Sequence, residues 1–541
     1  MNLLLLASWL VPLLLAPAVI AGNRCRWLLI AAPLPALAAA WLLPAGSQLS
    51  LPWLLLGTEL GMDGVQRLFL TFTALLWLAA SAHCLASDGE DPHGGRLRLF
   101  MTLAMSGNIG LILSTDMISF YLGFALMGLA SFGLVVHTAT RAARRAARVY
   151  LIMTLASEFL LLIALLLIYQ RTGLLAPAPE QLSGGSNLEM ALLFVSFAIK
   201  AGLFGFHVWL PLAHPAAPVS ASAVLSGAMI ATALVGWFTF LPLGGAAQPF
   251  WGWVFVVSGA LGATLAAAIG LLQQDPKVIL AYSSISKMSL FAAAIGVALH
   301  QPAAAAAIMV AITVYALVHG LCKGALFIGV GVIKQYHSRA LFGLLVIPAA
   351  ILSGAPFAGG AAAKDLLSGA LDTGGAAATT VLLFFGVAAL VTPMLMVRFL
   401  WVMTHYRGTA RLSQRVTPWL LLILTAALLP IALVDALTPG SALLWALGLA
   451  LALLVSSGRA PWLHPLSGTI PAGDLIELFP QRWPTIAARV HSRQAAAAAE
   501  RSVRPLPIRA WIPAISADRA ASLALPLVLL VLLVSLWLFP R

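Results

Sequence analysis

The sequence predicts an all-α polytopic membrane protein. Of its 541 residues, 61% are hydrophobic and 9% are charged, and its mean hydropathy is +1.00. Apolar runs of roughly 17–25 residues, the length that crosses the hydrocarbon core of a bilayer, recur along the chain. Because a backbone surrounded by lipid must satisfy its own hydrogen bonds, we interpret each run as a transmembrane helix. This composition excludes a water-soluble globular protein.

These runs predict about sixteen transmembrane helices. The first begins at Met1 and has no basic residue at its amino end. The second run follows at once, so we interpret the first as a retained helix and not as a cleaved signal peptide. The expected spans are 1–20, 27–43, 64–86, 98–114, 117–136, 148–169, 190–208, 219–241, 250–273, 278–299, 303–333, 341–371, 376–402, 416–437, 440–457 and 520–539.

The placement of basic residues predicts the orientation, because short loops rich in Lys and Arg stay cytoplasmic. With the amino terminus outside, the basic loops all fall inside, and the opposite loops are nearly free of basic residues. The inside loops hold Arg24, Arg26, Arg96, Arg98, Arg141, Arg144, Arg145, Arg148, Lys277, Lys334, Arg339, Arg407, Arg411 and Arg415. We therefore expect a bacterial-type inner (plasma) membrane protein with both termini on the non-cytoplasmic side. The net charge of +13 follows from this pattern and predicts no nucleic-acid partner.

The cysteines provide no cofactor site. Cys25, Cys84 and Cys322 are far apart and have no cluster spacing, so an iron–sulfur cluster, a structural zinc site and a disulfide framework are unsupported. The chain also shows no nucleotide-binding loop. We expect no cofactor, no metal and no catalytic residue in this chain; whether it is a subunit of an enzyme is left open.

Four lysines lie inside spans that are otherwise apolar: Lys200, Lys287, Lys323 and Lys364. A charge in hydrocarbon is costly and usually marks an ion path, a counter-ion or a ligand. The function is therefore expected at these lysines. A structural pairing of each lysine with backbone carbonyls is the alternative.

Two spans are interrupted close to these lysines. The segment 206–220 follows Lys200 and holds three prolines, and the segment 354–360 has a Gly-Ala-Pro sequence just before Lys364. Proline removes a helical hydrogen bond and breaks or kinks a helix. Breaks at corresponding places in two halves indicate an inverted repeat whose broken helices meet at an ion site. Simple kinks, which are common in membrane helices, are the alternative.

Four motifs follow one another along the chain in a characteristic order and spacing. They are Ala198-Ile199-Lys200 with Phe206–Pro218, Gln274–Ser286, His319–Phe327, and Gly354–Gly359 with Lys364-Asp365. In these motifs the chain resembles the antiporter-like proton-translocating subunits of respiratory complex I, of Mrp cation/proton antiporters and of group 4 hydrogenases such as formate hydrogenlyase, over about residues 60–405. The nearest alternative is the membrane subunit of DAB-type inorganic carbon transporters, a shorter branch.

The resemblance implies a core of two inverted five-helix repeats that contain broken helices. A basic cytoplasmic segment with an amphipathic helix would follow this core. The expected divisions are N-terminal helices 1–3 at 1–97, the first repeat (helices 4–8) at 98–241, the second repeat (helices 9–13) at 250–402, helices 14–15 at 403–457, the basic segment at 458–519 and the last helix at 520–541.

The resemblance also implies that the buried charges pass protons at mid-membrane. Lys200 and Lys364 would be the switching lysines of the two repeats. His319 and Lys323 are four residues apart on one helix face, which suits a relay between the repeats. The other candidates for ion translocation are Lys287, Asp365, His207 and His214.

One departure from the family pattern concerns the partner of Lys200. Most pumping members have a glutamate before Leu-Met-Gly that pairs with this lysine, and Ala125 stands in its place. Glu158, where relatives often carry an acidic residue, would be the remaining partner. The first repeat therefore has either an altered proton path or no conduction.

Three functions stay open. The leading hypothesis is a proton- or ion-translocating subunit of a redox-driven complex, whose partners are other membrane subunits and a peripheral module with iron–sulfur, flavin or metal centres. The second is the membrane subunit of a proton-coupled CO2/bicarbonate uptake complex with a soluble zinc partner. The third is a non-conducting scaffold that retains the fold. The sequence does not distinguish protons from sodium ions.

Overall fold

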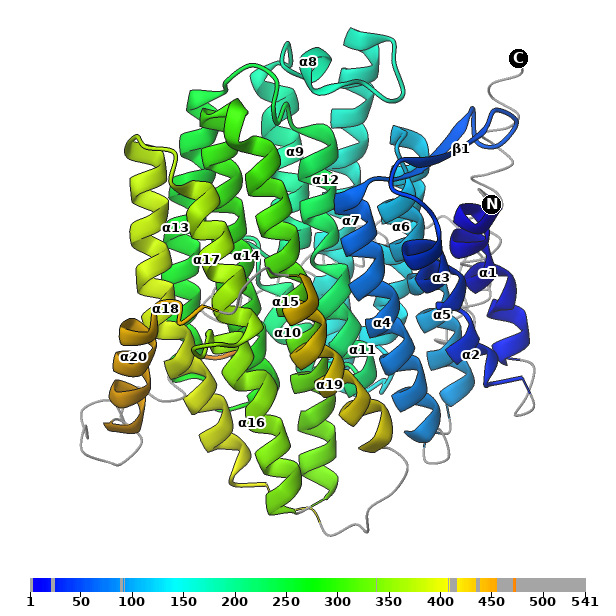
Figure 1. Cartoon of the computed structure of the whole chain (residues 1–541). Coiled ribbons are helices and arrows are strands. Elements are labelled where there is room, and N and C mark those ends of the chain that lie inside the picture. The colour runs from blue at the N-terminus through cyan, green and yellow to red at the C-terminus, as the bar shows by residue number, and fades with distance from the viewer. Residues whose placement is uncertain are drawn as a thin grey trace, which may run out of the picture.

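A computed structural model describes residues 3–20, 25–87, 91, 93–336, 338–406, 408, 416–433, 438–454 and 470–472. Of the described residues, 79% are helical, and eleven of the described helices are long and apolar enough to cross a membrane. The long helices run side by side as one bundle (Figure 1), which confirms a multi-pass membrane protein. The last expected helix at 520–541, and the basic segment at 458–519 except 470–472, lie outside the described residues.

The amino-terminal part contains a feature that the sequence did not predict. A two-stranded antiparallel hairpin, β1 (Ser47–Leu51) and β2 (Thr58–Met62), lies between α3 and α4, so the prediction of an entirely helical chain is wrong here. The Asp116 carboxylate, which caps α6, accepts a hydrogen bond from the Glu59 N–H (2.9 Å) and fixes the hairpin to the bundle. The helices are α1 (Leu3–Ile20), α2 (Leu28–Ala31), α3 (Leu34–Leu42) and α4 (Gly64–Ser87).

The first group of core helices follows α4. The span expected at 219–241 is one continuous run that contains a π-helical turn, and the span expected at 190–208 ends early, at Ala201. The elements are α5 (Gly94–Leu113), α6 (Met117–Val135), α7 (Arg141–Thr172), α8 (Pro179–Leu182), α9 (Asn187–Ala201), α10 (Trp209–Ala216), α11 (Val219–Val224), η2 (Leu225–Met229) and α12 (Thr232–Phe240).

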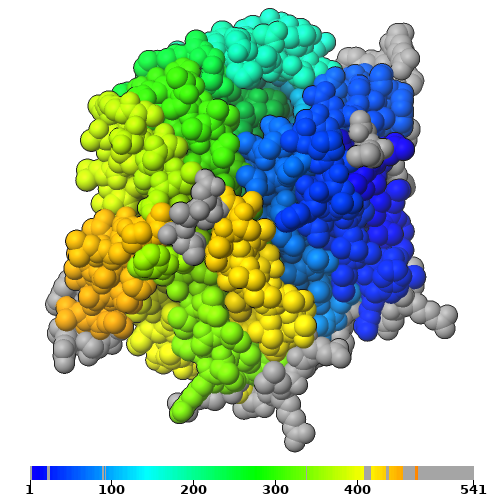
Figure 2. Space-filling model, viewed as in Figure 1, coloured from blue at the N-terminus to red at the C-terminus, as the bar shows by residue number. Residues whose placement is uncertain are grey.

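A second group repeats the same order of long helices and one broken helix. The elements are α13 (Pro249–Leu272), α14 (Pro276–His300), η3 (Pro302–Ala304), α15 (Ala305–Gln335), α16 (Arg339–Ser353), α17 (Gly359–Leu371) and α18 (Ala376–Met403). Two further helices complete the described chain, α19 (Val416–Leu433) and α20 (Ala442–Leu454). In Figure 2, α19 lies against the amino-terminal helices and α20 lies at the opposite edge of this face; α19 contacts α4, and α20 contacts α18.

Both predicted helix breaks are present, and glycine causes each of them. α9 and α16 are each 15 residues long, and each ends at a glycine with left-handed backbone, Gly202 (φ +65°) and Gly354 (φ +83°). Glycine adopts this conformation without the steric cost that a Cβ brings. The prolines after Lys200 act later than expected, because Pro211 lies inside α10 and Pro218 caps α11.

The two hairpins that open the groups pack closely through glycine. A Cβ on Gly123 of α6 would lie 2.7 Å from the Leu111 backbone nitrogen of α5. A Cβ on Gly296 of α14 would lie 2.6 Å from the Gly252 carbonyl oxygen of α13. Since real Cβ atoms do not approach this closely, the helix spacing in each hairpin depends on the missing side chain. Small residues allow such contact between membrane helices.

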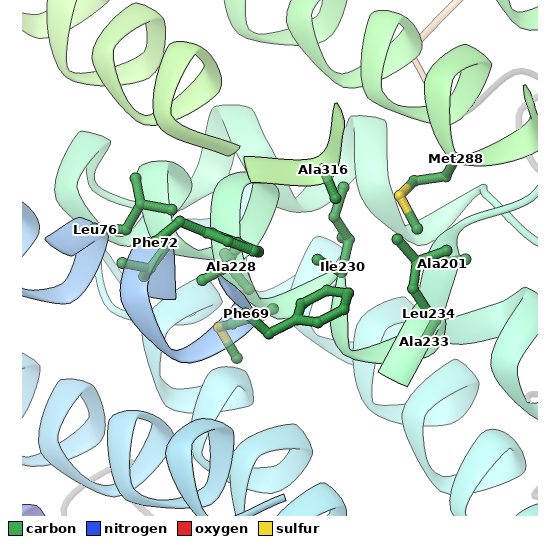
Figure 3. Packing of buried hydrophobic residues seen from close by; sticks show 14 of the residues in the cluster. Phe69, Phe72, Leu76, Ala201, Ala228, Ile230, Ala233, Leu234, Met288 and Ala316 are labelled. Carbon is green, nitrogen blue, oxygen red and sulfur yellow. The ribbon is translucent and has the colours of Figure 1, made fainter. Parts of the chain in front are cut away.

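Apolar packing fills the centre of the bundle. Figure 3 shows Phe69 and Phe72 of α4 packed towards Ala228 of η2 and Ile230, with Leu234 of α12 and Met288 of α14 further along. All are buried. This core surrounds the polar residues at the helix breaks with low-dielectric material.

Two basic residues that the orientation argument placed in loops are buried. Arg98 donates to the Val19 carbonyl oxygen at the end of α1 (2.9 Å). Lys277 lies in the first turn of α14 and is 7% exposed. Neither helps to define the cytoplasmic side, so that interpretation is wrong for these two residues. Each basic head instead meets backbone carbonyls inside the protein.

At one end of the bundle the α4–α5 and α6–α7 loops meet. His137 and Asp91 are joined by a hydrogen bond (Nε2 to Oδ2, 2.6 Å), and Arg96 donates to the His137 carbonyl oxygen (2.9 Å). Burial lowers the pKa of His137, and the hydrogen bond with Asp91 offsets this only in part. Burial raises the pKa of Asp91, but hydrogen bonds from the His93 N–H and from His137 outweigh it, so the pKa of Asp91 is lowered overall.

We expect valine at position 296 to force α13 and α14 apart. Gly296→Val should lower the free energy of unfolding by about 1–3 kcal/mol, because the added atoms meet the backbone of α13. The measurement is thermal unfolding in detergent. Gly343→Val is the control, since a Cβ at Gly343 meets nothing within 4 Å. Equal midpoints for the two variants would contradict the close packing.

The loop pair predicts a stability that falls in mild acid. The neutral imidazole is favoured in the folded state, so the contribution of His137 is complete above its ordinary pKa of 6.5 and is lost as the pH falls below it. The stabilisation from Asp91 is complete above its ordinary pKa of 3.8 and is lost only as the pH falls below that value. The glutamine side chain of the His137→Gln variant does not titrate. The unfolding midpoint of this variant should therefore decrease less between pH 7.5 and pH 5.5 than that of the wild type. The same slope in both proteins would exclude His137 as its source.

Candidate functional site

The nine predicted site residues fall into two groups in the structure. Glu158 and Lys200 lie together between α7 and α9. The others lie in the break before α10 and along α10, α14, α15 and α17: His207 in the break, and His214, Lys287, His319, Lys323, Lys364 and Asp365 on the helices. All are buried except Asp365, which is half-buried.

Lys200 and Glu158 are close but do not touch. Lys200 occupies the last turn of α9, where the carbonyl end of the helix dipole favours a cation. Its Nζ lies 5.2 Å from the centre of the Phe124 ring. The two charged side chains interact electrostatically, yet among the described residues they form no direct ion pair, and Glu158 Oε1 has no hydrogen-bond partner. The predicted pair is brought together without a contact.

Gly128 makes room for the Glu158 carboxylate against α6. A Cβ at this position would lie 2.5 Å from Glu158 Oε1 and 2.8 Å from Thr154 Cγ2. Ala125, where the family usually has its glutamate, is only half-buried on the same helix. The carboxylate next to α6 is therefore supplied by Glu158 of α7 and not by a residue of α6.

A small cavity next to Lys200 has room for about one water molecule. Ser157 and Ser196 fix the spacing of α7 and α9 at this level, because each hydroxyl donates to the carbonyl oxygen of the other residue (2.8 Å both ways). The side chains that line the cavity are Phe124, Tyr150, Thr154, Ser157, Ile199, Lys200 and Trp209.

Lys323 lies at the centre of the second group and is fully buried. Its Nζ donates to the Leu280 carbonyl oxygen of α14 (2.6 Å), which also accepts from the Ser284 hydroxyl (3.1 Å). His319 lies one turn earlier on α15, and neither ring nitrogen has a hydrogen-bond partner in the described structure. Its ring interacts electrostatically with Lys323 and Lys287. The predicted relay pair is thus one buried unit.

Lys287 projects from α14 towards α15. Its Nζ donates to the Tyr315 hydroxyl and lies 4.4 Å from the centre of the Tyr315 ring. The lysine also interacts electrostatically with Lys364 and Lys323. It therefore lies between the centre of the group and the second broken helix.

Lys364 closes the second helix break. Its Nζ donates to the Ser353 carbonyl oxygen, the last of α16 (2.7 Å). A Cβ on Gly354 would occupy the place of the Lys364 amine, so glycine is required here for space as well as for its backbone angle. Asp365 interacts electrostatically with Lys364 from the next position. The pairing of lysine with a backbone carbonyl, which was the alternative interpretation of these residues, is present at Lys364 and at Lys323.

Sequence reasoning missed Lys277 as a member of the site. Its Nζ donates to the carbonyl oxygens of His214 (3.0 Å) and Ala217 (2.6 Å) and to the Ser222 hydroxyl (3.3 Å). It thus satisfies carbonyls that the α10–α11 junction leaves free. The signal was available, because α14 is apolar on all sides, and such helices are buried throughout.

The two predicted histidines differ in their surroundings. His214 stacks on Phe327 (ring centres 4.4 Å apart), and neither ring nitrogen has a described partner. It interacts electrostatically with Lys277 and Lys323. His207 stacks on Phe204 (4.7 Å) and accepts the Gly205 N–H on Nδ1 (3.1 Å) within the break. His214 therefore lies with Lys323 and His319, and these three residues form the central group. His207 instead holds the broken segment between α9 and α10.

The described residues show no hydrogen bond that connects Lys200 with the central group. Ala201 and Met288, which directly follow Lys200 and Lys287 in the sequence, are part of the apolar core drawn in Figure 3. Nor do the described residues contain a cluster of three or more His, Cys, Asp or Glu side chains that could hold a metal ion. What the site offers is buried amines and imidazoles with few partners.

A multi-pass bundle with two glycine-ended helix breaks and buried lysines beside them defines a class of membrane proteins with broken helices at an internal charged site. Residues 114–347 match the family described as "NADH:quinone oxidoreductase/Mrp antiporter, TM". Residues 114–347 thus belong to the antiporter-like membrane-subunit superfamily, and the resemblance that the four motifs indicated is confirmed.

Individual relatives agree with this assignment. Hydrogenase-4 component B of Escherichia coli (strain K12) is 30% identical over 301 residues, which are 52% of this chain and 44% of the relative. NADH-ubiquinone oxidoreductase chain 4 of Carassius auratus is 30% identical over 305 residues, which are 53% of this chain and 64% of the relative. The chain thus spans about half to two thirds of these two relatives.

The fold is similar to a solved assembly. A chain of the Mrp complex from Dietzia sp. DQ12-45-1b superimposes with a TM-score of 0.71 at 22% identity. The match covers 94% of this chain and 61% of that one. It extends the shared fold well beyond residues 114–347.

We predict energetic coupling between Glu158 and Lys200. Removing either charge leaves the other buried and uncompensated, so Glu158→Gln and Lys200→Ala should each lower stability and assembly. The double variant should recover part of the loss, with a coupling of about 1–3 kcal/mol. The measurements are the thermal midpoint and the yield of assembled complex. Additive losses, in which the double variant loses the sum of the two single losses, would show that the two residues act independently.

Proposed function

We propose that the chain is a proton-translocating, antiporter-like membrane subunit of a larger complex. The observation that carries this proposal is the set of buried lysines held by neutral acceptors. Lys323 and Lys364 each bind one backbone carbonyl, and Lys287 binds one tyrosine hydroxyl. A buried amine without a fixed carboxylate can be charged or neutral according to small changes around it. Such groups suit the loading and release of protons.

The proposed path runs through the central group. Protons would pass among His214, Lys323, His319 and Lys287 and reach Lys364 at the second break. The repeated order of the two helix groups, each with one glycine-ended break, supports two inverted repeats at about 98–241 and 250–402. Sixteen transmembrane helices with both termini on the non-cytoplasmic side complete the proposed topology.

The partners are proposed from the relatives. Two of them carry the names of components of a hydrogenase and of an NADH-ubiquinone oxidoreductase, and the third belongs to an Mrp complex. We therefore expect further membrane subunits, and a peripheral redox module as the energy source. A soluble zinc protein for carbon dioxide hydration is the alternative module. Mass spectrometry and metal analysis of the complex purified from native membranes distinguish the two.

One observation favours a second candidate, a first repeat that does not conduct. Glu158 and Lys200 are not in contact, and the cavity beside them has room for about one water molecule. A water chain is not available there in this arrangement. The protein would then act as a scaffold in its first half and as a conductor in its second.

The proposal predicts that proton movement requires Lys323. The purified complex is placed in liposomes, a membrane potential is imposed, and a pH-sensitive dye reports proton movement. Lys323→Met should reduce the rate of proton movement at least about tenfold, since the proposed path loses its central titratable group. Lys334→Met is the matched control, because Lys334 lies at the end of α15, over the Tyr406 ring.

Three outcomes separate the hypotheses. Loss of movement in Lys323→Met but not in Lys200→Ala favours conduction by the second half alone. Loss in both variants favours conduction through both repeats. A wild-type complex that moves no protons, or a Lys323→Met variant with the wild-type rate, contradicts the proposed function.

A further inference from the structure

We propose that Tyr315 is a positioning residue that holds Lys287 between the central group and the second helix break. This inference rests on the proposed function and adds a residue to its path. Tyrosine in an apolar helix is usually a core aromatic, so its position in the sequence is no reason to select it. The contacts of Tyr315 identify its role.

The tyrosine contacts the lysine in two different ways. Its hydroxyl accepts a hydrogen bond from Lys287 Nζ, and its ring centre lies 4.4 Å from the same atom. The ring also packs edge to face against Phe291, with ring centres 5.3 Å apart. Tyr315 is 1% exposed and Lys287 is 4% exposed. The amine is therefore enclosed by one aromatic side chain that supplies both an acceptor and a negative ring face.

Tyr315 extends the row of polar groups on α15. Tyr315, His319 and Lys323 are four residues apart from one to the next, so all three lie on one face of the helix. Eight residues of helix span about 12 Å. The row therefore extends from Lys323 towards the amino-terminal end of α15 by about two turns.

The neighbouring helix α14 presents matching partners to this row. The Leu280 carbonyl oxygen meets Lys323, and Lys287, about two turns later, meets Tyr315. Since α14 and α15 are antiparallel neighbours, the two contacts lie at two levels of one interface. On α15, His319 lies between Tyr315 and Lys323, the two residues that make these contacts. The interface thus has a polar contact at each end.

Charge repulsion explains why Lys287 needs this support. Lys287 interacts with two other lysines, Lys323 and Lys364. The Tyr315 hydroxyl is its one hydrogen-bond acceptor among the described residues. Without that hydroxyl the amine would be buried near two like charges with no acceptor, a costly state. Tyr315 therefore keeps Lys287 within reach of Lys364.

The test removes the hydroxyl and keeps the ring. Tyr315→Phe retains the contacts with Phe291 and the ring face over Lys287. It should lower the proton-translocation rate of the reconstituted complex about tenfold, because a hydrogen bond to a charged group is lost. It should also shift the pH profile of the rate, since Lys287, Lys323, His319 and Lys364 share one electrostatic group. Tyr336→Phe, a buried tyrosine at the end of α15, is the matched control and should keep the rate within about twofold.

The outcomes separate this inference from the proposed function. If the wild type moves protons and Tyr315→Phe has the same rate and pH profile, the inference is wrong and the proposed function stands. If the wild type moves none, the proposed function fails, and a double-mutant cycle of thermal stability with Lys287→Met and Tyr315→Phe decides the inference. Non-additive losses support the pair, and additive losses overturn it.

Discussion

The structure depends on one constraint, that backbone carbonyls freed inside a membrane must find donors. Each helix that ends inside the bundle leaves its last carbonyls without intrahelical partners. Lysine side chains supply donors at the second glycine-ended break, where Lys364 binds the Ser353 carbonyl, and at the α10–α11 junction, where Lys277 binds those of His214 and Ala217. At the first glycine-ended break the Trp209 indole N–H donates to the Ile199 carbonyl oxygen. At the two places served by lysine, the same bonds that stabilise the fold keep titratable amines inside it.

The first half of the bundle shows how a charge partner can move to another helix. Ala125 leaves α6 without the usual carboxylate, and Gly128, one turn later, opens space that Glu158 fills from α7. The carboxylate interacts electrostatically with Lys200 without a direct ion pair among the described residues, beside a cavity with little room for water. The second half keeps short contacts between its lysines and neutral acceptors. The two halves are alike in fold and unlike in their electrostatics.

Much of this architecture could be predicted because hydropathy directly reports burial in lipid. The long helices, both breaks and the burial of Lys287, Lys323 and Lys364 followed from apolar runs interrupted by Gly, Pro and Lys. The hairpin at 47–62 did not, since its strands have only five residues each and provide no long period-2 pattern. The partners of Lys277 and of Lys287 were also out of reach, because a lysine's acceptor is set by tertiary contact and not by spacing.

The burial of Lys277 has a consequence for how the chain is made. A lysine at the start of an apolar helix is normally kept at the membrane surface while the protein is inserted. Here residues 214–222, which supply its three acceptors, precede it in the sequence and leave the ribosome first. The binding partners are already in the membrane when the lysine arrives. The order of synthesis therefore supplies the acceptors before the charge that needs them.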